Sequence, residues 1–199
     1  MRPTICGITS ALHDQLMNKF SLLVLPLILV WSANGSAADY PAPQSPAIPD
    51  GTGYVEIPGA QVAINPAHAY KTIIDGQSAA AKPTGLLPAL NRASLLLNAL
   101  AVAHVGKANQ KIVIVFHGPA VDGLLNNAGY RAKFGVDNPN LKVVKEISDA
   151  GAVLFVCGQH MAGHKLGIEE LTPQIRLATA ASLVLVTYQN DGYALLPDK

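Results

Sequence analysis

A cysteine stands at the end of a strongly apolar stretch of the sequence, where a thiol could do chemistry. Residues 152–156 are apolar at every position, which predicts a strand covered by helices on both faces. Cys157 ends this strand, and Gly158 then allows a sharp turn of the backbone. Sites in open parallel sheets form at the carboxyl ends of strands, so Cys157 is a candidate nucleophile. The alternative is an inert, buried thiol, because free cysteines are among the most buried residues.

Two histidines could assist this thiol. His160 follows Cys157 by three residues, and His117 ends a second apolar run at residues 112–116, just before Gly118. Neighbouring parallel strands would bring His117 to the same edge of the sheet as Cys157. A protonated imidazole close to the sulfur would favour the thiolate, which is the reactive form. The alternative for His160 is an ordinary histidine in a solvated loop.

The same segment leaves a metal site open as a second interpretation. Cys157, His160, Met161 and His164 lie within eight residues, with His117 potentially near. Soft sulfur combined with imidazole suits copper(I) or zinc, although the spacing matches no standard zinc pattern.

The N-terminal part of the chain has the layout of a secretory signal. Met17-Asn18-Lys19 is a short positive start, Phe20–Trp31 is nearly all apolar, and Ser36-Ala37-Ala38 supplies small residues for cleavage. We therefore expect residues 1–38 to comprise an upstream extension and a signal peptide that starts near Met17, with a periplasmic or secreted mature chain. An uncleaved anchor is the alternative. Cleavage would remove Cys6 and leave Cys157 as the single thiol.

Composition excludes one class of partner and bounds the fold. The 199 residues carry a formal net charge of +1 without a basic run, which argues against nucleic acid as a partner. Half of the residues are hydrophobic, enough for a sizeable core. Residues 39–66 are rich in proline and predict an extended spacer outside the core, or, after Tyr54, an irregular strap packed on the domain. The folded domain is expected at residues 67–199.

Apolar patterns within the domain predict alternating strands and helices. We expect five strands, at 70–74, 111–117, 152–156, 175–178 and 193–196. We expect long helices at 86–104, at 179–190, and after Asn138-Pro139, together with a short helix at 121–127 that ends at Asn126–Gly129. Residues 131–137 predict irregular structure, and Ala180, Leu183, Val184 and Val186 predict the inner face of the last helix. This order favours a three-layer α/β/α fold with a parallel sheet of about five strands.

The domain resembles the DsrE/DsrF-like sulfur-relay proteins, in their exported single-domain branch. The resemblance spans about Tyr70–Leu196 and depends on the order and spacing of four motifs. These are His117-Gly118-Pro119-Ala120, Asn138-Pro139-Asn140, Ala150-Gly151 ahead of Val156-Cys157-Gly158-Gln159, and Gln189-Asn190-Asp191-Gly192-Tyr193-Ala194.

This resemblance implies a function for the thiol. It implies that Cys157 carries sulfur as a persulfide, with no cofactor, and that the chain forms a trimer or hexamer. The catalytic set would then be Cys157, His117 and His160. Gly158, Gln159 and Gly118 would line the site, with Gly158 leaving room for a second sulfur atom. A sulfurtransferase-like carrier is implied more than a turnover enzyme, and its sulfur donor and acceptor stay unknown. A third interpretation is a binding or assembly module in which Cys157 is inert.

Overall fold

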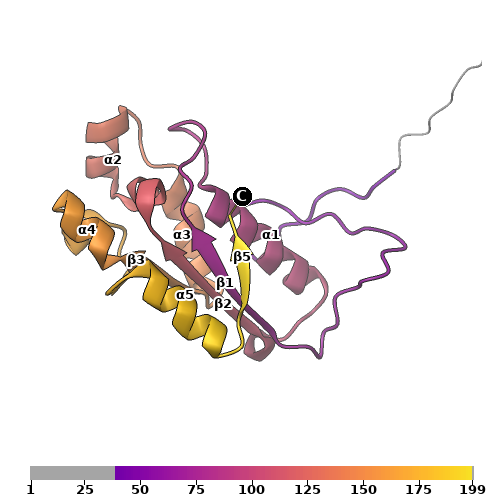
Figure 1. Ribbon diagram of the computed structural model, residues 1–199. Coiled ribbons are helices and arrows are strands. Elements are labelled where there is room, and N and C mark those ends of the chain that lie inside the picture. The colour runs from indigo at the N-terminus through magenta and orange to yellow at the C-terminus, as the bar shows by residue number, and fades with distance from the viewer. Residues whose placement is uncertain (1–38, 199) are drawn as a thin grey trace, which may run out of the picture. The chain divides into compact units, whose positions relative to one another are not determined.

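Five parallel strands form a single sheet at the centre of the part of the chain that the structure describes. The computed structural model describes residues 39–198. The strands are β1 (Tyr70–Gly76), β2 (Gln110–Phe116), β3 (Val153–Cys157), β4 (Arg176–Ala178) and β5 (Ala194–Pro197), and their order across the sheet is β4-β3-β2-β1-β5 (Figure 1). The five predicted strands are thus confirmed, with ends shifted by up to two residues. Such shifts are usual, because terminal hydrogen bonds rather than hydropathy fix the ends.

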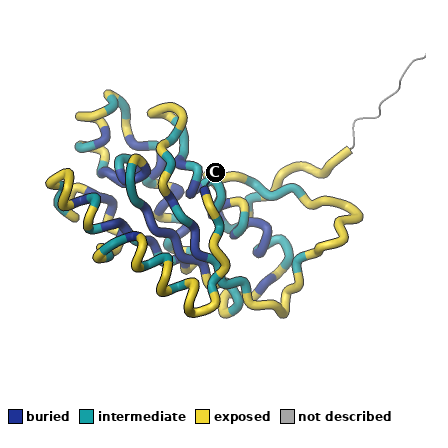
Figure 2. Tube along the Cα trace, viewed as in Figure 1, coloured by how far each residue is buried: buried dark blue, intermediate teal, exposed yellow. Residues whose placement is uncertain are grey.

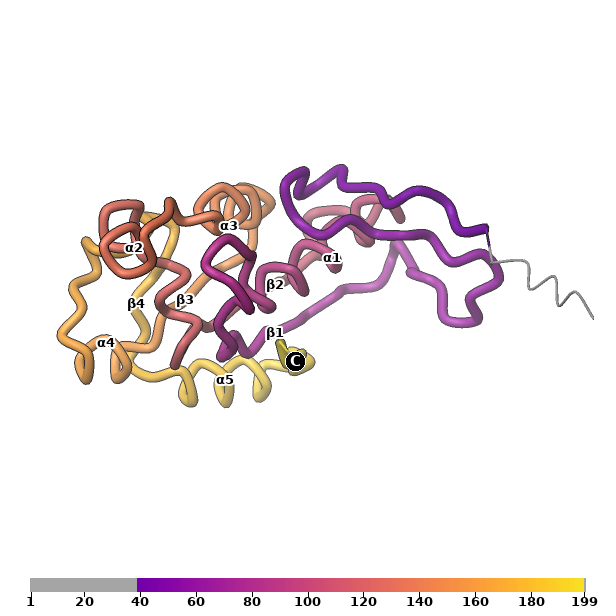
Figure 3. Tube along the Cα trace, turned by 90° about the horizontal axis from the view of Figure 1, so that it is seen from above, coloured from indigo at the N-terminus to yellow at the C-terminus, as the bar shows by residue number. Residues whose placement is uncertain are grey.

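Helices cover both faces of the sheet, which makes three layers. α1 (Pro88–Val102) and α3 (Asn140–Asp149) pack together on one face, and α5 (Ala181–Asn190) lies on the other (Figure 3). α2 (Asn127–Phe134) and α4 (Gly158–His164) lie beyond the carboxyl ends of the strands (Figure 1). The expected three-layer α/β/α class is confirmed. Parallel sheets require this cover, since both of their faces are apolar.

The core is unequal on the two faces. A large buried cluster joins α1, α3 and one face of the strands, whereas the cluster under α5 consists of Ile73, Val113, Val115, Cys157 and Ala181. In Figure 2 the buried tube runs along the central strands and the inner side of α1. The thiol therefore belongs to the thinly covered α5 side of the sheet.

The expected inner face of the last helix is only partly right. Val184 packs toward the sheet as expected, together with Ala181, Leu185 and Tyr188. Leu183 and Val186 are 57% and 55% exposed, so the expectation is wrong for them. α5 is apolar around most of its circumference, so hydropathy alone could not select the buried side.

The segment after the second strand differs from the expectation. Gly118–Leu124 is a 3₁₀ helix, and α2 begins at Asn127 in place of the expected irregular chain. The sequence predicts a helix end at Asn126, but its side chain caps the start of α2 by accepting a hydrogen bond of 2.9 Å from the N–H of Gly129. Asparagine suits both ends of a helix, so the motif alone was ambiguous.

Part of the expected spacer packs into the core. Ile48 is fully buried, and its N–H donates a hydrogen bond of 2.8 Å to the side chain of Asn98 on α1. The amide of Asn98 also donates to the carbonyl oxygens of Ile48 and Thr52. Residues 47–52 therefore form a strap packed on α1, and after Tyr54 the side chain of Ile64 also packs against the core. The proline-rich composition favours an extended chain, but burial of Ile48 and its hydrogen bonds to Asn98 hold this segment on the domain.

Candidate functional site

Cys157 is held at the junction of β3 with two helices. It is the last residue of β3, α4 begins at Gly158, and the main-chain N–H of Ala181, the first residue of α5, donates a hydrogen bond of 3.3 Å to its sulfur. Unpaired N–H groups at helix starts carry partial positive charge, which favours negative charge on the sulfur. The contact with α5 was missed at the sequence level, because no motif signals a main-chain donor 24 residues away.

The thiol is less open than a free nucleophile at a surface. Cys157 is 7% exposed, and the segment between β4 and α5 lies across it. The side chain of Gln159 donates a hydrogen bond of 3.3 Å to the carbonyl oxygen of Thr179, which links α4 to this segment. A reagent therefore reaches the sulfur only when the cover over it moves.

Gly158 lies in close contact with the backbone that follows β4. A Cβ there would lie 2.6 Å from the carbonyl oxygen of Ala178 and 3.2 Å from that of Thr179. The glycine thus permits close approach of two backbones. Gly118 is needed for a separate reason: its φ of +55° lies in the left-handed region, where the chain turns out of β2.

His117 is paired with a carboxylate that sequence reasoning missed. Its Nε2 lies 2.7 Å from Oδ1 of Asp75 at the end of β1, and both side chains are partly buried. Asp75 follows an apolar strand pattern in the sequence, just as His117 does, and that shared position was the available signal. The structure brings His117 to the edge expected for it, on the strand next to that of Cys157.

His160 lies on α4 rather than in a loop. Its ring stacks on that of His164, with centroids 4.1 Å apart, and Nδ1 of His164 donates a hydrogen bond of 3.0 Å to the His160 carbonyl oxygen. Burial lowers the pKa of His160 below its usual range, and His164 lowers it further. His117 and Lys133 also lower this pKa, and Asp122 opposes them. This lowered pKa makes His160 a weaker candidate than His117 for the cation expected beside the thiol.

The metal interpretation gains no support. Within residues 39–198, no three His, Cys, Asp or Glu side chains come together as a possible metal-binding group. The sulfur of Cys157 accepts a hydrogen bond from the start of α5, while the rings of His160 and His164 stack on each other. The short sequence spacing thus does not become a shared site in space.

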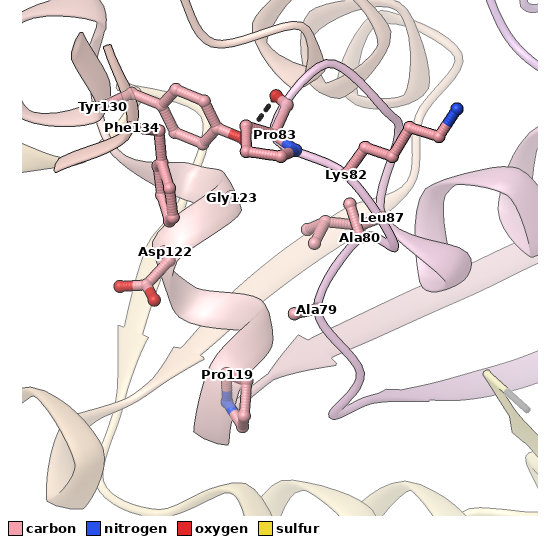
Figure 4. Close-up of a pocket in the computed structure, with 10 residues that line it drawn as sticks. All are labelled: Ala79, Ala80, Lys82, Pro83, Leu87, Pro119, Asp122, Gly123, Tyr130 and Phe134. Atoms are coloured by element: carbon pink, nitrogen blue, oxygen red, sulfur yellow. Dashed lines mark hydrogen bonds between the residues drawn. The ribbon is translucent and has the colours of Figure 1, made fainter. Parts of the chain in front are cut away.

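A pocket of about 150 Å³ lies beside the site (Figure 4). Its walls are the loop after β1, the 3₁₀ segment and α2. Two of its polar groups are already partnered: the Tyr130 hydroxyl donates a hydrogen bond of 2.8 Å to the Pro83 carbonyl oxygen (Figure 4), and Asp122 pairs with Lys133 at 2.6 Å. The residues that line it include neither Cys157 nor His117, so the pocket is separate from the thiol.

The motifs around the site are those of a known family. A model of the DsrE/DsrF-like family matches residues 88–197, which include β2, β3 and the thiol. The chain belongs to the DsrE/DsrF-like family. Among solved structures it is similar to MTH1491 of Methanobacterium thermoautotrophicum, a protein of unknown function, with 15% identity and a TM-score of 0.45 over 65% of this chain and 98% of that one. Nothing among the curated proteins matches.

Membership in this family indicates a role of the sulfur-relay type.

Across residues 39–198, no helix is long and apolar enough to cross a membrane.

Proposed function

We propose that this protein is an exported sulfur carrier that holds a sulfane sulfur on Cys157 as a persulfide. The observation that carries the proposal is the position of the thiol in a DsrE/DsrF-like chain: it ends β3 and accepts a hydrogen bond from the first N–H of α5. That donor favours the thiolate, which is the form that attacks sulfur.

The transfer step needs no oxidant. The Cys157 thiolate attacks the outer sulfur of a donor R–S–S–H, a new S–S bond forms at Cys157, and the S–S bond of the donor breaks. The donor leaves as R–S⁻ and takes up the proton that the Cys157 thiol released. The sum is Cys–SH + R–S–SH → Cys–S–SH + R–SH.

The test is the mass of the protein after treatment with inorganic polysulfide. We expect full-length protein in a Cys6→Ser background to gain one or more sulfur atoms, and a reductant to remove them. Cys157→Ser in the same background should gain none while keeping its fold, because a serine oxygen can still accept the Ala181 N–H. Wild-type protein that gains no sulfur under these conditions would refute the carrier function.

A second function is favoured by the low exposure of the thiol together with the apolar outer side of α5. Leu183 and Val186 on α5 are each more than half exposed. An assembly module with an inert Cys157 fits both observations. The two functions separate in one measurement, because an inert thiol stays unmodified in the folded protein and reacts only after denaturation.

Export is part of the proposal, and it concerns residues outside the described range. Its support is the charged start, apolar run and small residues of positions 17–38. N-terminal sequencing of the exported form is expected to begin near Asp39. A mature end at Met1 or Met17 would show that the segment is not removed.

A further inference from the structure

Three neighbouring strands place a carboxylate, an imidazole and a thiol side by side. Asp75 pairs in register with Val115, and Phe116 with Val156, so the next residues along β2 and β3 are His117 and Cys157. Side chains alternate between the faces of a strand. Val115 and Cys157 belong to the cluster under α5, so Asp75 and His117 lie on the α5 side as well.

The pairing of Asp75 with His117 fixes which imidazole nitrogen is free. An ionised carboxylate can only accept, so Nε2 of His117 carries the hydrogen that is shared over 2.7 Å with Oδ1 of Asp75. The lone pair of the neutral ring is then on Nδ1. The side chains of His117 and Asp75 are 24% and 29% exposed, which leaves the contact less screened by water than a surface ion pair.

We propose that Asp75 is a positioning residue: it holds His117 in the tautomer whose Nδ1 accepts the proton of the Cys157 thiol. Parallel strands lie about 4.8 Å apart, so His117 and Cys157 are nearest neighbours across the sheet. The two side chains are not hydrogen-bonded to each other in this structure, and a general base can act on its proton either directly or through one water. This inference rests on the proposed function, which requires the thiolate.

The proton balance of sulfur transfer follows from this arrangement. His117 takes the proton from Cys157 and becomes an imidazolium, whose charge the Asp75 carboxylate stabilises. The thiolate attacks the outer sulfur of the donor, the S–S bond of the donor breaks, and the departing thiolate takes the proton from His117. His117 ends as it began, and no electrons are gained or lost overall.

His160 is the alternative acceptor for the Cys157 proton, but its contacts suit that role less well than those of His117. Its ring stacks on His164, and no carboxylate among residues 39–198 hydrogen-bonds to it. Without such a partner neither its tautomer nor its imidazolium form is fixed. The carboxylate of Asp122, which acts on His160 through its charge, is already paired with Lys133.

Alkylation of Cys157 by iodoacetamide tests the inference without any sulfur donor. The protein is the full chain in a Cys6→Ser background, and the rate is followed by intact mass. Asp75→Asn and His117→Ala should each slow alkylation at pH 7 about tenfold or more. The double variant should be no slower than His117→Ala alone, since both residues act on one proton. Asp75→Glu, which keeps a carboxylate, should recover part of the rate.

The control is Asp149→Asn. Asp149 is also half of a carboxylate–cation pair, with Lys145 at 2.6 Å, but it ends α3, just before the start of β3. It should alkylate at the parent rate. Nitrogen NMR of the His117 ring gives a second readout that a merely structural residue would not move: Nε2–H in the parent, and a mixture of tautomers in Asp75→Asn.

The outcomes separate this inference from the proposed function. If the parent takes up sulfur from polysulfide but Asp75→Asn alkylates at the parent rate, the inference is overturned and the carrier function stands. Effects of the two substitutions that multiply in the double variant overturn it too. If the parent takes up no sulfur while Asp75→Asn still slows alkylation, the carrier function fails and the role of Asp75 in activating the thiol is upheld.

Discussion

The main-chain N–H of Ala181 donates a hydrogen bond of 3.3 Å to the sulfur of Cys157, which joins the start of α5 to the end of β3. This bond stabilises charge on the sulfur and also covers it, since Cys157 is 7% exposed. The same hydrogen bond therefore favours the reactive thiolate and limits the access of reagents to the sulfur. We consequently expect small reagents to modify Cys157 faster than large ones.

We expect the folded protein to react with iodoacetamide but to resist a maleimide carrying a large polyethylene glycol chain. A small displacement of Thr179 and Ala180 admits the first reagent, whereas the second needs a much wider opening. Both rates are measured by mass in the Cys6→Ser background, with protein unfolded in urea as the reference for full access. Equal protection from both reagents in the folded state would contradict the prediction.

The close approach at Gly158 gives a prediction about stability. Gly158→Ala would place a methyl group 2.6 Å from the Ala178 carbonyl oxygen, so the backbone must shift, at a cost of about 1–3 kcal/mol in the free energy of unfolding. Gly163 lies in the same helix and has open space around its Cβ position. Gly163→Ala should therefore stabilise the protein, by about 0.5–1 kcal/mol. Urea unfolding of both variants is the measurement, and equal effects would show that the contact at Gly158 is unimportant.

Much of this fold was predictable because the buried strands are apolar on both faces. The runs at 112–116 and 152–156 gave β2 and β3, and their parallel pairing then set His117 beside Cys157. α5 and the strap were not predictable in the same way. Leu183 and Ala181 are both apolar, and only packing against the sheet decides which of them is buried.

Long-range polar contacts account for what the sequence could not reveal at the site. Asp75 and His117 are separated by 42 positions, and Cys157 and Ala181 by 24. Asp198 is a further case: its buried carboxylate accepts hydrogen bonds from the N–H groups of Gln77 and Ser78. Each pair joins segments that are far apart in the sequence, so a linear pattern does not record it.

The lowered pKa of His160 predicts how stability depends on pH. An imidazole in the unfolded chain takes up a proton near pH 6.5, while the folded protein resists protonation of His160 until lower pH. The unfolded state then binds more protons, so the free energy of unfolding falls as pH drops from 6.5 through the lowered folded pKa. His160→Gln should lose less stability than the parent between about pH 7.5 and about pH 5.5.

The matched control for His160 is His104→Asn. His104 is exposed and has a φ of +55°, which asparagine tolerates. Urea unfolding at the two pH values should show the parent's pH dependence in this control. If His160→Gln also keeps that dependence unchanged, His160 is not the group that responds.

The outer side of α5 gives the last prediction, which concerns assembly. Leu183 and Val186 project from a helix whose inner side already covers the sheet, and they are 57% and 55% exposed. We expect a second copy of the chain to cover these side chains, since burying large apolar groups is favourable. Light scattering should then give a mass well above one subunit, and Leu183→Glu with Val186→Glu should reduce it. Val62→Glu, at a site 94% exposed before β1, is the control and should leave the mass unchanged. A parent protein that stays monomeric at micromolar concentration would contradict the assembly, and it would leave the apolar side of α5 without its expected partner.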